Sequence, residues 1–189
     1  MFYKNNLSYL LLILLFSCQP VELIAPVEFD YSKFDTISIN AKEISVNIKY
    51  DSIFSEDNIE DQVSTTPLTI IENWINENIN YYGNQNQLVI NIVDASITKK
   101  EIENIDAKKY QEKTIYLYEV FFLVEYELLD DNDYFLANTT VQSTRSTTSQ
   151  KYISLNEKEV IINDLLNKAL KDFIIETKLM TKQYMGEYL

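Results

Sequence analysis

The sequence predicts an α+β fold in the order β-α-β-β-β-α, an antiparallel-rich sheet with two amphipathic helices packed on one face. Three observations predict it. Several segments have alternating apolar residues, and two others have apolar residues at helical spacing. A turn-rich segment in the middle of residues 114–149 predicts that they form a hairpin. Elements in this order favour helices on one side of a single sheet. We expect one domain over residues 36–189.

The domain is expected to begin with β structure. Apolar residues alternate from Thr36 to Tyr50, and their parity changes at Lys42 and Glu43, which indicates a bulge or a short turn. Residues 51–65 are polar and acidic, so we expect a loop there.

The first helix has clear end signals. Thr66 is a suitable N-cap, and Pro67 suits the first helical position because its missing N–H is not needed there. Apolar residues recur at helical spacing as far as Tyr82, and Gly83 is a typical C-terminal stop. We therefore expect a helix from Pro67 to Tyr82.

Two strands and a charged connection should follow. Residues 87–97 are apolar at both parities, which predicts a strand partly covered on both faces. Residues 99–113 are highly charged and are expected to connect the strands in solvent. Residues 114–128 form the most apolar strand. One face carries Tyr116, Tyr118, Val120, Phe122, Val124 and Tyr126, and the other carries Ile115, Leu117, Phe121 and Leu123.

The chain should close with a hairpin and a long helix. Asp130 to Asp133 have turn chemistry, and residues 134–149 are a Thr/Ser-rich return strand. Ser154 and Glu157 fit a capping box at the start of an amphipathic helix that ends near Gly186.

Composition excludes several functions. The formal net charge is −13, which argues against nucleic-acid binding because phosphates require a basic surface. Two glycines cannot supply a phosphate loop or a dinucleotide fingerprint. The chain has no histidine, which removes catalytic triads and most transition-metal sites. We expect no cofactor, no metal and no enzymatic activity.

Carboxylate-only hydrolysis is the one enzymatic alternative. Asp94, Glu119 and Glu125 lie in or at the end of apolar strands and are its only candidates. Surface carboxylates without a catalytic role are the favoured interpretation. The run from Asp130 to Asp133 lacks the glycine and the distal glutamate of a calcium loop, so a turn is favoured there.

The strand at 114–128 is apolar on both faces, but two helices can cover only one face. Either the loops at 51–65 and 99–113 cover the second, or it is a contact site. Such a site would involve Ile115, Leu117, Phe121 and Leu123, or else the face of Tyr116 and Phe122. It would receive a protein partner, a second copy or a lipid.

The N-terminus has the layout of a secretory signal. A polar start precedes an apolar run of about ten residues, too short to span a membrane. Leu15-Phe16-Ser17-Cys18 resembles the lipobox of bacterial lipoproteins, which implies a signal peptide over residues 1–17 and lipidation of Cys18. Residues 18–35 contain two prolines and are expected to form a tether. The alternative is that Cys18 is a free buried thiol.

The element order behind this motif resembles small envelope lipoproteins of Gram-negative bacteria. These include auxiliary lipoproteins of ABC-type transport systems and an uncharacterised alphaproteobacterial group with a Thr66-Pro67-Leu68…Trp74-like helix. The resemblance implies a membrane-anchored, periplasm-facing accessory protein with a protein partner in a transport or envelope-assembly complex. The alternative is a lipid or lipopolysaccharide carrier. Gln19, where inner-membrane lipoproteins of enterobacteria carry aspartate, implies the outer membrane.

Overall fold

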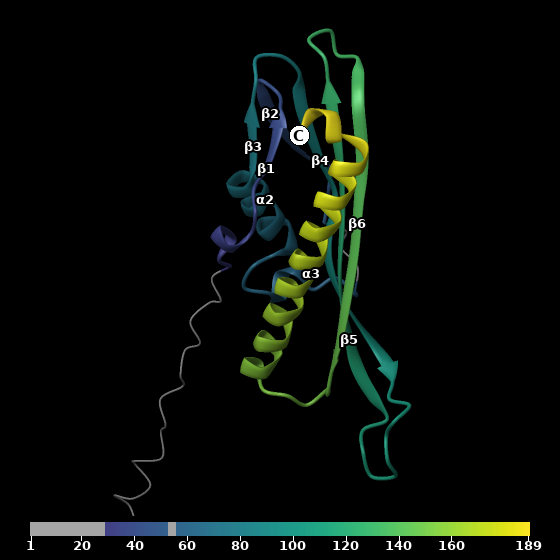
Figure 1. Cartoon of the computed structure of the whole chain (residues 1–189). Helices are drawn as coiled ribbons and strands as arrows, with labels where there is room; N and C mark the ends of the chain where they lie inside the picture. The colour runs from purple at the N-terminus through teal and green to yellow at the C-terminus, as the bar shows by residue number, and fades with distance from the viewer. Residues whose placement is uncertain (1–28, 53–55) are drawn as a thin grey trace, which may run out of the picture.

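The computed structural model describes residues 29–52 and 56–189 and has the predicted α+β fold (Figure 1). Within these residues, a four-stranded sheet in the order β2-β4-β5-β6 accompanies a two-stranded sheet of β1 and β3. The strands are β1 (Ile37–Asn40), β2 (Glu43–Ile48), β3 (Ile79–Tyr82), β4 (Gln87–Glu103), β5 (Thr114–Leu129) and β6 (Phe135–Ser149). The α-helices are α2 (Pro67–Asn78) and α3 (Leu155–Tyr184). Residues 1–17 and Cys18 lie outside the described residues.

Both helices pack on one face of the larger sheet (Figure 1). β4, β5 and β6 are antiparallel neighbours, whereas β2 runs parallel to β4. The even-numbered residues of β5 from Tyr118 to Leu128 are all buried, because this face of the strand is covered by the helices. Trp74 of α2 and Phe173 of α3 meet edge to face, with ring centroids 5.7 Å apart, and so join the two helices in one core.

β4 differs from its expected form because of a bulge. Its pairing with β5 shifts between Ile92 and Asp94, so the parity of the strand changes at Val93. Leu88, Ile90 and Ile92 before the bulge and Ala95 and Ile97 after it are all buried in one core. The bulge thus places apolar residues of both parities on one covered face. The other face is partly covered, as expected, since Val89 is half-buried and Asn91 is buried.

α2 is one turn shorter than the sequence predicts. Thr66 caps it, accepting a hydrogen bond from the Thr69 N–H at 3.2 Å, but the helix ends at Asn78. Residues 79–82 instead form β3, paired in parallel with β1 from Ile37↔Ile79 to Asn40↔Tyr82. Ladder hydrogen bonds with β1 thus replace the last turn of the helix, and Gly83, with φ of 116°, follows β3 rather than α2.

The domain begins before Thr36. Residues 29–35, assigned to the tether by the sequence, include the short 3-10 helix η1 (Tyr31–Lys33), whose Tyr31 belongs to the core. The side-chain amide of Asn78 donates hydrogen bonds of 3.1 and 3.0 Å to the carbonyl oxygens of Tyr31 and Phe34. These bonds attach the segment to the end of α2.

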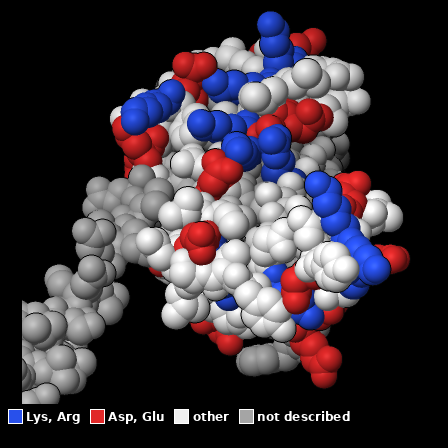
Figure 2. All heavy atoms as spheres, turned by 90° about the horizontal axis from the view of Figure 1, so that it is seen from below, with Lys and Arg blue, Asp and Glu red and all other residues white. Residues whose placement is uncertain are grey.

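The charged connection is also shorter than expected, because β4 continues to Glu103 and β5 begins at Thr114. These extensions form a hairpin that projects beyond α3 and β6 (Figure 1). Seen from that end, basic and acidic side chains are interspersed, and no single sign dominates (Figure 2). No helix in the described ranges is long and apolar enough to cross a membrane.

Candidate interaction surface

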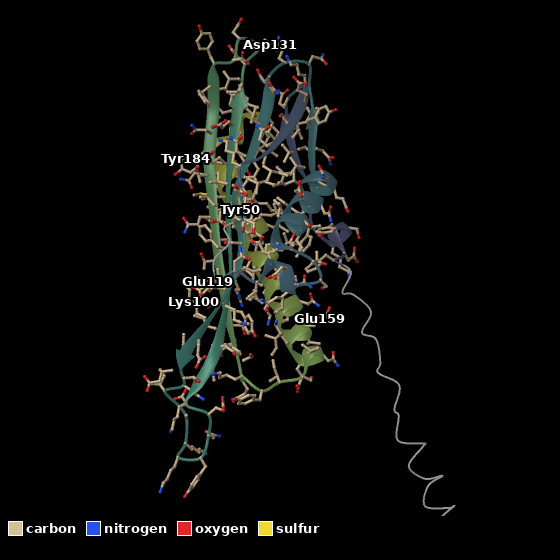
Figure 3. All side chains as sticks on the ribbon, turned by 180° about the vertical axis from the view of Figure 1, so that it is seen from behind. Tyr50, Lys100, Glu119, Asp131, Glu159 and Tyr184 are labelled. Atoms are coloured by element: carbon tan, nitrogen blue, oxygen red, sulfur yellow. The ribbon has the colours of Figure 1, made fainter. Side chains whose placement is uncertain are left out.

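The outer sheet face, opposite the two helices, carries the apolar row predicted as a contact site. Ile115, Leu117, Phe121 and Leu123 make up this apolar row, with Glu119 between Leu117 and Phe121. From Tyr118 onward, the residues that alternate with the row are buried under the helices. All four are half-buried. Figure 3 shows this face from behind, with Glu119 and Lys100 near the projecting hairpin and Asp131 at the opposite end of the sheet.

Polar side chains flank three residues of the apolar row on both sides, whereas Ile115 lies opposite Ile102 of β4. The register places Lys100 and Thr148 beside Leu117, Ser96 and Thr144 beside Phe121, and Asp94 and Gln142 beside Leu123. On the β6 side the flanking row is Asn138, Thr140, Gln142, Thr144, Ser146 and Thr148, all exposed. A protein-binding patch usually has apolar side chains at its centre and hydrogen-bonding groups around them.

Neither loop that could have covered this face does so in the part of the chain that the structure describes. Residues 57–59 extend the sheet edge instead, since Asn58 pairs with Thr98 and Ile59 enters the core. At the hairpin tip, Ile105 and Tyr110 are 91% and 92% exposed, so the tip does not fold back onto the sheet. The half-burial of the apolar row therefore comes from neighbouring strands.

One end of the face is acidic and internally hydrogen-bonded. Asn47 of β2 donates to Asn91 of β4 at 3.1 Å, and Asn91 donates to Glu127 of β5 at 3.2 Å. Lys49 forms an ion pair with Glu125 at 3.4 Å. These contacts satisfy polar groups across three strands and leave the apolar row as the unpartnered part of the face.

A second polar cluster lies along β4, between the end of β2 and residues 57–59. The Tyr50 hydroxyl donates to the carboxylate of Glu60, which also accepts a hydrogen bond of 3.2 Å from Asn58. Burial raises the pKa of Asp94, and the nearby negative charge of Glu60 raises it further, while a hydrogen bond from Ser96 lowers it. Burial is also the main reason that the pKa of Tyr50 is raised.

The three carboxylates considered for hydrolysis are not brought together. Asp94 is opposite Leu123, whereas Glu119 is opposite Thr98, about 13 Å further along β4 at 3.3 Å per residue. Glu125 instead forms an ion pair with Lys49. The negative charge that raises the pKa of Asp94 comes from Glu60, the first residue of a short 3-10 helix (Glu60–Gln62). The sequence did not single out Glu60 because residues 51–65 have no periodic pattern.

Among the described side chains, no group of three or more His, Cys, Asp or Glu is placed to hold a metal ion. The run from Asp130 to Asp133 is the predicted hairpin turn. The Asp130 carboxylate accepts from the N–H groups of Asn132 and Tyr134 at 2.8 and 2.9 Å, and Asp133 adopts φ of 62°. Asp131 forms an ion pair with Lys42 at 2.7 Å.

Comparison with known proteins yields matches among solved structures alone. No protein-family profile and no curated protein matches the chain. Among solved structures, the chain resembles a minor lipoprotein from Acinetobacter baumannii, with 10% identity and a TM-score of 0.41. The match covers 74% of this chain and 95% of that one. A match of this size is too weak to assign the chain to that protein's family.

Proposed function

We propose that the protein is a lipid-anchored bacterial envelope protein whose domain is a non-enzymatic binding module. It would act as an accessory subunit of a transport or envelope-assembly complex, held at the outer membrane through Cys18 and facing the periplasm. The observation that carries this proposal is the apolar row on the outer sheet face, because no described segment covers it. An apolar surface that its own chain leaves uncovered is typical of an interaction site.

A protein partner suits this surface better than a lipid does. The apolar row is a narrow strip on a sheet, and exposed Thr, Ser, Gln and Lys side chains flank it. A carrier would instead need an enclosed apolar cavity for acyl chains. One hollow in the described part, lined by Gln62, Ser64, Leu155, Lys158 and Ile162, has polar side chains in its wall. We therefore favour a protein partner over the lipid or lipopolysaccharide carrier.

The test is purification of the full-length protein from its native membrane in mild detergent, followed by mass spectrometry of everything that accompanies it. We expect envelope proteins in stoichiometric amounts with the wild type. They should be lost with the double variant Phe121→Gln and Leu123→Asn, while its unfolding temperature stays close to that of the wild type. A matched control, Thr144→Asn and Ser146→Asn, changes the same face beside the apolar row and should keep the partner.

Two outcomes would count against this proposal. Acyl lipid beyond the protein's own anchor, without protein, would favour the carrier. Unfolding of the Phe121 and Leu123 double variant would show that these side chains support the fold rather than a contact. The anchor is tested separately: Cys18→Ser should abolish the mass of the attached lipid and release the protein from the membrane fraction.

A further inference from the structure

The two edges of the four-stranded sheet are protected very differently. β2 is six residues long and is flanked by Lys42 and Lys49. Beyond it, residues 57–59 cover the same side of β4, where the Lys99 N–H donates to the carbonyl oxygen of Asp57 at 2.7 Å. A sheet edge is usually protected from pairing with another chain by short length, by lysines or by a covering segment.

β6, at the other edge, lacks these devices. It is fifteen residues long, contains no proline, and pairs with β5 without interruption from Tyr116↔Ser149 to Leu128↔Ala137. Across residues 29–52 and 56–189, no strand pairs with its other side. Its one charged side chain, Arg145, forms an ion pair with Asp172 of α3 at 2.6 Å. This free edge of β6 therefore presents main-chain donors and acceptors over its whole length.

The free edge of β6 also differs from the rest of the chain in carrying no acidic residue. The chain has 29 acidic residues, yet residues 134–156 contain none. Contact between two copies of so acidic a chain would bring carboxylates together over most of the surface, and like charges repel. β6 itself carries no carboxylate, and Asp172 of α3 beside it is paired with Arg145, so the edge is suited to a second copy of the chain.

Antiparallel pairing of β6 with itself gives complementary neighbours. A twofold axis at Gln142, the midpoint of the strand, sets Thr140 opposite Thr144 of the second copy and Asn138 opposite its Ser146. Such Thr and Ser pairs across strands are favourable, and they place no charge opposite another charge.

Exposed apolar side chains lie on the same side of the domain. Ile175 and Leu179 are 63% and 53% exposed, and they follow Asp172 by three and seven residues, so they share its side of α3. Since Asp172 contacts Arg145 of β6, these two side chains lie beside the free edge. Phe135, at the start of β6, is also exposed. A second copy would shelter this apolar area from water.

We propose that two copies of the chain pair antiparallel through β6, with the twofold axis at Gln142. The product is a continuous sheet of eight strands, four from each copy, with all α-helices on one face and both apolar rows on the other. The pairing is independent of the function proposed above, because it depends on the main-chain edge of β6 and not on the apolar row of β5.

Disulfide trapping in the full-length protein tests this register. With Gln142→Cys, the two introduced thiols would lie on residues directly opposite each other, about 5 Å apart between Cα atoms, which a disulfide can bridge. The matched variant Ser146→Cys would separate its thiols by about 26 Å, at 3.3 Å for each of eight residues. We expect a disulfide-linked dimer at least several-fold more abundant for Gln142→Cys. Equal trapping of both variants, or trapping of neither, would overturn the proposal.

Charge exchange distinguishes self-pairing from chance collision. In the Gln142→Cys background, Thr140→Lys with Thr144→Lys places lysines directly opposite each other, so trapping should fall. Thr140→Glu with Thr144→Glu should lower it likewise, and mixing the lysine and glutamate proteins should restore it. Trapping that is insensitive to these charges would contradict the antiparallel register, as would a mixture that does not recover. Both positions are exposed, and circular dichroism checks that the variants fold.

Discussion

The ring of Phe122 in β5 lies 5.5 Å, centroid to centroid, from the ring of Phe173 in α3, at an interplanar angle of 58°. Phe173 also meets Trp74 of α2, so one buried ring connects the sheet to both helices. Aromatic pairs in these tilted and edge-to-face arrangements add to the stabilisation from burial alone.

Loss of this ring should strongly destabilise the domain. We expect Phe173→Ala to lower the free energy of unfolding by about 3–5 kcal/mol, because it removes a buried aromatic side chain and leaves a cavity. Denaturant titration followed by circular dichroism measures the change. Phe121→Ala is the matched control: Phe121 is adjacent to Phe122 but lies on the outer sheet face, and its cost should be about 1 kcal/mol or less. Comparable losses for the two variants would contradict the assignment of the faces of β5.

The two glycines offer a second matched comparison. Gly83 has φ of 116°, and an added Cβ would overlap the side-chain oxygen of Asn40, whereas an added Cβ at Gly186 meets nothing within 4 Å. We expect Gly83→Ala to cost about 1–3 kcal/mol through backbone strain and the clash. Gly186→Ala should leave the unfolding temperature nearly unchanged. Equal effects in a thermal scan would argue against the positive φ at Gly83.

The start of α3 allows a third prediction. The Ser154 hydroxyl accepts from the Glu157 N–H at 3.2 Å, and the Glu157 carboxylate accepts from the Ser154 N–H at 2.9 Å. Removal of an N-cap side chain of this kind costs about 1 kcal/mol, so Ser154→Ala should lower the free energy of unfolding by that amount. Asn156→Ala, one residue before Glu157 and equally exposed, is the control and should have little effect.

Local signals in the sequence correctly predicted those ends of elements that depend only on residues nearby in the chain. Thr66, Pro67, Ser154 and Glu157 marked both helix starts correctly, because capping needs only groups within one turn. The end of α2 depends on a partner about forty residues away. Ile79 to Tyr82 have an apolar pattern compatible with helix, and only pairing with β1 converts them to strand. The bulge at Val93 likewise appears only in the pairing with β5.

The apolar row was predictable for the same reason that the core was. Alternation along β5 separated its two faces, but the sequence could not say which face the helices cover. The cluster of Tyr50, Glu60 and Asp94 joins the segment after β2, a short 3-10 helix and the bulge of β4, and no spacing in the sequence connects them. The free edge of β6 did leave a signal, the run of residues 134–156 without a carboxylate.

The fourth prediction concerns pH and Asp94. Its Oδ1 is buried and accepts no hydrogen bond from the described residues, and burial raises its pKa. The folded state therefore holds this proton at pH values where the unfolded chain, with an ordinary Asp pKa of about 3.9, has released it. Since the folded state binds more protons in this interval, stability falls as the pH rises through it.

Asp94→Asn should remove this loss. We expect the variant's free energy of unfolding, relative to that of the wild type, to increase as the pH rises above about 4 and then to level off. Denaturant titrations across the acidic range measure this difference.

Asp130→Asn, the control, changes the net charge equally but should show the opposite trend. Hydrogen bonds from the N–H groups of Tyr134 and Asn132 lower the pKa of Asp130, so its carboxylate stabilises the fold above the ordinary pKa and loses this effect in acid. A difference for Asp94→Asn that does not change with pH would show that its carboxyl titrates alike in both states.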